Sequence, residues 1–178
     1  RLADGCIAIT VSGRHKGRLT ADDIMRVDAE GQSLDGRPPS AETRLHTALY
    51  RRYPDVGAVL HPHSPGAIVL SRLLTGAVVL ENHELLKALR GIHTHDARVI
   101  IPIFPNDQDI PRLAGVVDGW LDRYGDAHAY IIASHGFYTW GTSVGETLWG
   151  DALFGGAQAE ALEFLFEIES RLYGAKPS

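Results

Sequence analysis

The fold class is first indicated by one segment, Val56-Gly57-Ala58-Val59-Leu60-His61-Pro62-His63-Ser64-Pro65, which changes from one kind of secondary structure to another within a few residues. The apolar run 56–60 predicts a short buried strand. Ser64 is a favoured helix N-cap and Pro65 a favoured first-turn residue, so a helix is expected to follow directly. Two imidazole side chains stand between these two elements, at the end of the predicted strand.

The same alternation continues on both sides of this stretch. Further strands are predicted at 6–11, 77–80, 98–104 and 128–133, and helices at 41–53, 84–90 and 110–124, with a long last helix from Ser143 to about Tyr173. Interleaved strands and helices favour a layered α/β fold. Because the 178 residues contain no repeat or linker, we predict a single domain over 1–178.

Composition excludes several classes of protein. The chain has 44% hydrophobic and 22% charged residues, as ordinary globular proteins do. No apolar run approaches the roughly 20 residues of a membrane span. The formal net charge of −5 argues against a general nucleic-acid binder. Cys6 is the only cysteine, so no intrachain disulfide can form, and we expect a cytoplasmic protein.

Three of the nine histidines suggest a metal site. In a strand, residues two apart point to the same face about 6.6 Å from each other, so His61 and His63 can converge on one ion. The pair also fits two solvated histidines at a strand end. His135 ends the predicted strand 128–133 and precedes Gly136, which brings its imidazole to the sheet rim, where a histidine packed at the core edge is the alternative.

A second pair with the same spacing, His93 and His95, follows the predicted helix stop at Gly91 and precedes Asp96. These features are typical of a loop, which has no fixed period of two to force the rings together. We therefore predict that this pair does not bind the metal.

Two carboxylates are candidates for acid–base work. Glu42 and Glu84 each lie in the first turn of a predicted helix, where a negative charge also stabilises the helix dipole. The residues alone leave both interpretations open. The segment 12–18, with Ser12, Gly13 and Lys16, is typical of a basic turn with exposed amides that would suit a phosphate. A solvated turn is the more usual explanation for such a segment taken alone.

These segments occur in one order. Ile9-Thr10-Val11-Ser12-Gly13-Arg14-His15-Lys16-Gly17-Arg18-Leu19-Thr20, Pro39-Ser40-Ala41-Glu42-Thr43 and His61-Pro62-His63-Ser64 resemble the class II aldolase/adducin family. The segments 82–84, 102–110 and 135–141 narrow the resemblance to a branch that removes water from a small phosphorylated ketose. Pro62 stands where threonine is usual. The resemblance implies a central, mostly antiparallel sheet flanked by helices, and a homotetramer.

The resemblance also implies a role for each candidate residue. It implies that His61, His63 and His135 hold one zinc ion per chain. Glu84 matches the acid–base carboxylate of the dehydratase branch, and Glu42 a ligand or base of the aldolase branch. Residues at the positions that hold the substrate phosphate in relatives are Ser12, Gly13, Lys16 and Ser40.

Relatives carry a helix and a Gly-Asn loop before the segment that begins here, so we expect part of the phosphate site to lie upstream of Arg1. Two other functions stay open. The same zinc would serve retro-aldol cleavage of a sugar phosphate, and an adducin-like relative would keep the fold as a non-enzymatic interaction module.

Overall fold

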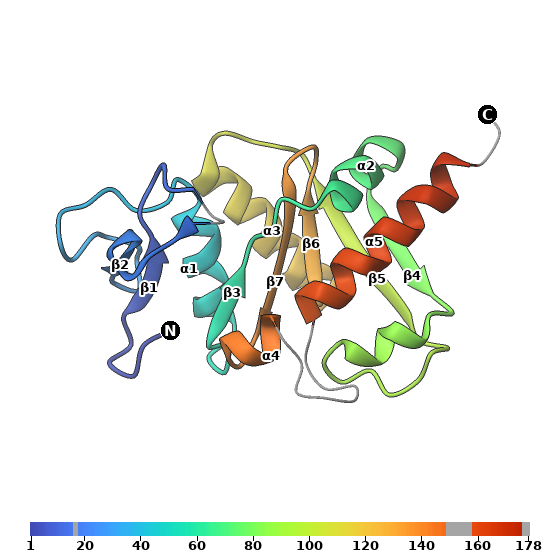
Figure 1. Cartoon of the computed structure of the whole chain (residues 1–178), viewed down its shortest axis with the longest axis horizontal. Helices are drawn as coiled ribbons and strands as arrows, with labels where there is room; N and C mark the ends of the chain where they lie inside the picture. Colours follow the sequence, from blue (N-terminus) through green and yellow to red (C-terminus); the bar gives the residue numbers. More distant parts are fainter. Residues whose placement is uncertain (16–17, 149–157, 176–178) are drawn as a thin grey trace.

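The computed structural model describes residues 1–15, 18–148 and 158–175. Its centre is a five-stranded sheet in the order β3-β7-β6-β5-β4 (Figure 1). The strands are β3 (Ala58–Leu60), β4 (Ala77–Glu81), β5 (Arg98–Phe104), β6 (Ala129–Ile132) and β7 (Gly136–Gly141). Within this sheet β5 and β6 run parallel, and the other three neighbouring pairs are antiparallel. The prediction of a central, mostly antiparallel sheet is confirmed.

Helices cover both faces of the sheet (Figure 1). The helices α1 (Thr43–Arg52) and α3 (Ile110–Tyr124) share a core with one face, and α2 (Pro65–Leu73) and α5 (Gln158–Gly174) with the other. The short helix α4 (Val144–Leu148) follows β7. An antiparallel hairpin of β1 (Ile7–Thr10) and β2 (Ile24–Val27), with the 3-10 turn η2 (Ala21–Asp23) between its strands, joins the core of α1 and α3.

Strand β6 shows how one apolar run fills both cores. Tyr130 and Ile132 lie in the core shared with α1 and α3, whereas Ala129 and Ile131 lie in the core shared with α2 and α5. Successive side chains of a strand point to opposite faces, so a strand covered on both sides reads as continuously apolar. The same alternation directs Phe137 of β7 to one core and Tyr138 to the other.

Several local predictions are confirmed. The strand at 98–104 and the helix at 110–124 have the predicted bounds. The side chain of Ser64 caps α2 by accepting a hydrogen bond from the Ala67 amide at 3.4 Å, and Pro65 lies in the first turn. The cap therefore begins the helix directly after the histidine pair, as the local sequence indicated.

Other helix boundaries differ from the prediction. The helix predicted at 84–90 is the 3-10 turn η3 (Glu84–Ala88), with His83 as its N-cap. Asn82, whose residue type is favoured as a helix cap, instead has φ of 60°, a left-handed conformation that asparagine tolerates, and turns the chain after β4. The helix predicted at 41–53 begins at Thr43, and Glu42 is its N-cap residue.

The long helix predicted from Ser143 is described only at its two ends, as α4 and α5, and residues 149–157 lie outside the described residues. None of the described helices is long and apolar enough to cross a bilayer.

Candidate metal centre

The pairing of β3 with β7 brings the predicted histidines together. Leu60 pairs with Thr139, and the pairing continues past the end of β3 because the Phe137 amide donates to the carbonyl oxygen of Pro62 at 3.1 Å. Strand β7 begins directly after His135, at this same end of the sheet. The two segments that carry histidines therefore lie side by side, although the strands β4, β5 and β6 come between them in the sequence.

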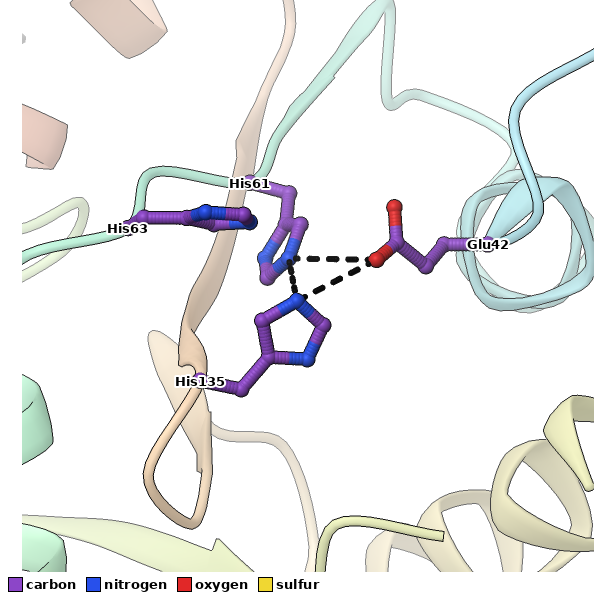
Figure 2. Close-up of side chains that lie close together, drawn as sticks. All are labelled: Glu42, His61, His63 and His135. Carbon is purple, nitrogen blue, oxygen red and sulfur yellow. Dashed lines mark hydrogen bonds and ion pairs between the residues drawn. The ribbon is translucent and has the colours of Figure 1, made fainter. Parts of the chain in front are cut away.

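The rings of the three histidines pack against one another. Their centroids lie 4.9 Å apart for His61 and His63, 4.9 Å for His61 and His135, and 4.7 Å for His63 and His135. Glu42 completes the group from the start of α1, pointing toward His61 and His135 (Figure 2). Its Oε1 atom lies 3.2 Å from Nε2 of His135 and 3.8 Å from Nε2 of His61.

This donor set fits a metal ion. One nitrogen or oxygen atom from each of the four residues lies within 4.8 Å of the others. Donor atoms at the corners of a tetrahedron around zinc lie about 3.4 Å apart, for bonds of roughly 2.1 Å. The Nε2 atoms of His61 and His135 are 3.4 Å apart. Three imidazoles with one carboxylate also match the ligands that zinc accepts, so the cluster is able to hold a metal ion.

The surroundings of His61 keep its imidazole neutral, with the hydrogen on Nδ1 and Nε2 available to bind a metal. Its side chain is 3% exposed, and Nδ1 lies 2.9 Å from the carbonyl oxygen of Phe137. A carbonyl can only accept, so Nδ1 carries the hydrogen and Nε2 keeps its lone pair for a metal. Burial lowers the pKa of His61 to about 4, against the opposing effects of that carbonyl and of Glu42.

The turn that carries His135 is tied to α2. Ser134 has φ of 56°, and its amide donates to Oγ of Ser71 at 2.9 Å. Because α2 begins directly after His63, one helix contacts both of the segments that carry histidines.

The predicted phosphate residues lie next to this cluster. The hydroxyl of Ser40 donates to Oε2 of Glu42 at 3.2 Å. The Ser40 amide donates to the Thr10 carbonyl at 3.0 Å, and the Ser12 amide to the Pro38 carbonyl at 2.9 Å. The turn at Ser12 and Gly13 is thereby held beside Ser40. Lys16 lies outside the described residues.

Glu84 lies at the opposite end of the sheet from the three histidines. It follows β4, whose last residue pairs with the first residue of β5, whereas the last residue of β5 pairs with Ile132 near the His135 turn. The length of β5 therefore separates the two ends by roughly 20 Å at about 3.3 Å per residue. Glu84 is largely exposed, and its hydrogen bond with Lys87 at 2.6 Å lowers its pKa.

The second histidine pair lies in the loop after η3, as predicted. His95 contacts Asp96 at 2.9 Å. Over the ranges 1–15, 18–148 and 158–175, the group of Glu42, His61, His63 and His135 is the one able to hold a metal, and it excludes His93 and His95.

A model of the class II aldolase and adducin N-terminal domain matches residues 1–169. The chain belongs to the class II aldolase and adducin family. Among family members, it is 62% identical over 176 residues to the methylthioribulose-1-phosphate dehydratase of Methylococcus capsulatus, an alignment that covers 99% of this chain and 82% of the relative. It is 51% identical over 174 residues to the Pseudomonas paraeruginosa protein of the same name, covering 97% and 81%.

Solved structures of class II aldolase relatives share the fold. YgbL of Escherichia coli, described as a putative aldolase/epimerase/decarboxylase, superposes with a TM-score of 0.73 at 26% identity, covering 99% of this chain and 77% of that one. The L-fuculose-1-phosphate aldolase of Thermus thermophilus gives a TM-score of 0.66 at 24% identity, covering 99% and 84%. The second likeness shows the fold alone.

Proposed function

We propose that the chain is a zinc-dependent hydro-lyase that converts 5-methylthioribulose 1-phosphate into 2,3-diketo-5-methylthiopentyl 1-phosphate and water, a step of L-methionine salvage. The cluster of three histidines and Glu42 carries the proposal, in a chain 62% identical to a relative named for this dehydration. A homotetramer and a cytoplasmic location complete the prediction.

Each group at the site is assigned a role. His61, His63 and His135 are the proposed protein ligands of one zinc ion per chain. When bound, zinc supplies a Lewis acid at the carbonyl end of the sugar. Ser12, Gly13, Lys16 and Ser40 are the proposed phosphate contacts, which would fix the orientation of the substrate and supply binding energy away from the reacting carbons.

The dehydration needs a base and an acid. The C3 proton leaves, the C4 hydroxyl departs as water, and the resulting enol tautomerises to the diketone, so every carbon stays in one product. Glu42 is the carboxylate within reach of the cluster, 3.2 Å from Nε2 of His135, and we assign it to proton transfer or to the fourth ligand position.

Glu84 is the second proposed acid–base group. Because it lies about 20 Å along the sheet from the cluster of its own chain, this role requires Glu84 to come from a neighbouring copy. Such an arrangement is compatible with the predicted homotetramer, and it makes the role of Glu84 depend on an assembly of at least two copies.

Identifying the products tests the proposed reaction. We would incubate the zinc-loaded protein with 5-methylthioribulose 1-phosphate and analyse the mixture by mass spectrometry. A single product lighter by one water supports the dehydratase. An aldehyde with a three-carbon phosphate identifies the aldolase alternative. A protein that takes up no zinc when loading is attempted, and that forms no product, favours the interaction module.

A further inference from the structure

Three aromatic rings form one row across three neighbouring strands. Tyr138 of β7 pairs directly with Tyr130 of β6. His61 is the residue after Leu60, which pairs with Thr139, so His61 lies opposite Tyr138 on the other side of β7. The row therefore runs from the edge of the metal cluster into the sheet, perpendicular to the strands.

The rings in this row are stacked face to face. The imidazole of His61 and the ring of Tyr138 have centroids 4.2 Å apart and planes 15° apart. Tyr138 and Tyr130 follow at 4.9 Å and 15°. These separations match the spacing of about 4.8 Å between neighbouring strands, so the backbone itself sets the stack.

The inner end of the stack is fixed by the core. Tyr138 is 0% exposed and Tyr130 1% exposed. The ring of Phe104 packs edge-on against Tyr130 at 5.6 Å, and the ring of His46 packs edge-on against Tyr138 at 5.2 Å. In a close-packed interior neither phenol ring can turn without displacing its neighbours.

We propose that Tyr138 is a positioning residue that holds the imidazole of His61 in its metal-binding orientation before the metal arrives. The inference rests on the proposed metal site. The face of Tyr138 fixes the plane of the imidazole, and the carbonyl oxygen of Phe137, 2.9 Å from Nδ1, fixes its rotation within that plane. Nε2 then points in one direction, toward His135 and Glu42 (Figure 2).

If Tyr138 orients the imidazole of His61 in advance, the protein should bind zinc more tightly than it would without the stack. Without the stack, His61 would have to give up rotamer freedom when it binds the ion, which weakens binding. Partners that orient a ligating histidine typically change metal affinity by about 10–100-fold. The ring rather than the hydroxyl carries this effect, since neither Tyr138 nor Tyr130 has a hydrogen-bond partner for its hydroxyl within the described parts of the chain.

Tyr130 offers a matched control, because it is an equally buried member of the same stack that does not contact His61. We would measure zinc affinity of the metal-free full chain by competition with a chromophoric chelator. Tyr138→Met should raise the Kd for zinc by about 10–100-fold. Tyr130→Met, and the conservative variant Tyr138→Phe, should stay within about threefold of wild type.

Equal zinc affinity in Tyr138→Met and Tyr130→Met would overturn the positioning role while leaving the proposed metal site intact. A wild-type protein that binds no zinc would overturn both proposals. Should Tyr138→Met not fold, proton NMR of the metal-free wild type decides. The ring protons of His61 should be shifted upfield by the face of Tyr138 stacked on them, and resonances at the positions of a free imidazole would overturn the inference.

Discussion

Gly136 packs so closely against the carbonyl oxygen of Pro62 that a Cβ atom at residue 136 would lie 2.3 Å from that oxygen. The same atom would lie 3.2 Å from Cε1 of His61. The segment that carries His135 and the segment that carries His61 and His63 thus touch at a position where a side chain does not fit. Glycine after His135 is therefore required by the approach of two ligand segments.

Gly136→Ala should push these two segments apart. We expect the free energy of unfolding to fall by about 1–3 kcal/mol, the usual cost of overpacking, and zinc affinity to fall by at least about tenfold. Chemical denaturation and chelator competition measure the two effects. Gly119→Ala is the control, because a Cβ there meets nothing within 4 Å and alanine favours the helix by about 0.5–1 kcal/mol. Equal behaviour of the two variants would refute the prediction.

Among the histidines, only the three in the cluster should determine the metal content. His61→Ala, His63→Ala and His135→Ala should each lower the zinc measured per chain by elemental analysis, because each removes one donor from the set. His93→Ala and His95→Ala should keep the wild-type content of one zinc per chain. A loss of zinc in either of these loop variants as complete as in His61→Ala would contradict the assignment.

Substitutions of Glu84 and of Glu42 should differ in their effect on zinc binding. Glu84→Gln should lower kcat by about 10²–10⁴, the usual range for a general acid or base, while zinc content and folding stay unchanged because Glu84 is exposed and remote from the cluster of its own chain. Glu42→Gln should lower kcat and also weaken zinc binding, since it removes a negative charge 3.2 Å from Nε2 of His135. Steady-state kinetics and elemental analysis measure both.

An inactive Glu42→Gln combined with a fully active Glu84→Gln would favour the aldolase-like assignment. A mixing experiment tests whether Glu84 acts from a neighbouring copy. The variants Glu84→Gln and His61→Ala, each inactive alone, should regain activity when they are assembled together, because a mixed assembly contains sites with an intact His61 from one copy and an intact Glu84 from the other. No recovery in verified mixed assemblies would count against Glu84 acting from another chain.

The phosphate contacts should act on substrate binding. Lys16→Ala should raise KM for the sugar phosphate and leave zinc content unchanged, because it removes a positive charge from the segment 12–18, which contains the turn at Ser12 and Gly13. Ser40→Ala should also disturb Glu42, to which the Ser40 hydroxyl donates at 3.2 Å, so kcat is expected to fall along with the rise in KM. An unchanged KM and kcat in Lys16→Ala would remove that turn from the site.

Burial of His61 should make the metal-free protein sensitive to acid. Its pKa is lowered from 6.5 to about 4 in the folded state, so below pH 6.5 the unfolded chain takes up a proton that the folded chain does not. Stability is therefore complete above pH 6.5 and falls progressively toward pH 4. Between pH 7 and pH 5 this histidine should cost about 2 kcal/mol of unfolding free energy.

Urea denaturation of the chelator-treated protein at both pH values measures this loss. His61→Gln should show a smaller loss between pH 7 and pH 5 than wild type. Some loss should persist in the variant, because burial also lowers the pKa of His128. An identical pH dependence in the two proteins would show that His61 is not the group responsible.

Sequence patterns were sufficient where one local signal decides the structure. The strand at 98–104 and the helix at 110–124 have the predicted bounds because their apolar periods are long and uninterrupted. The start of α2 follows from Ser64 and Pro65 alone. Near Asn82 the local signal misled, because asparagine is favoured both as a helix cap and in the left-handed conformation that the chain adopts there.

Local patterns in the sequence were enough to predict the alternation of strands and helices, the exclusion of the loop pair His93 and His95 from the metal site, and the two histidines that one strand end presents together. The same patterns left open whether His135 and Glu42 join them, and the packing of the folded chain brings all four residues together. That packing also stacks Tyr138 on His61 and places Glu84 at the far end of the sheet. Local periodicity fixes which face of an element a residue occupies. Strand register and layer packing decide which faces meet, and they depend on contacts between residues far apart in the chain.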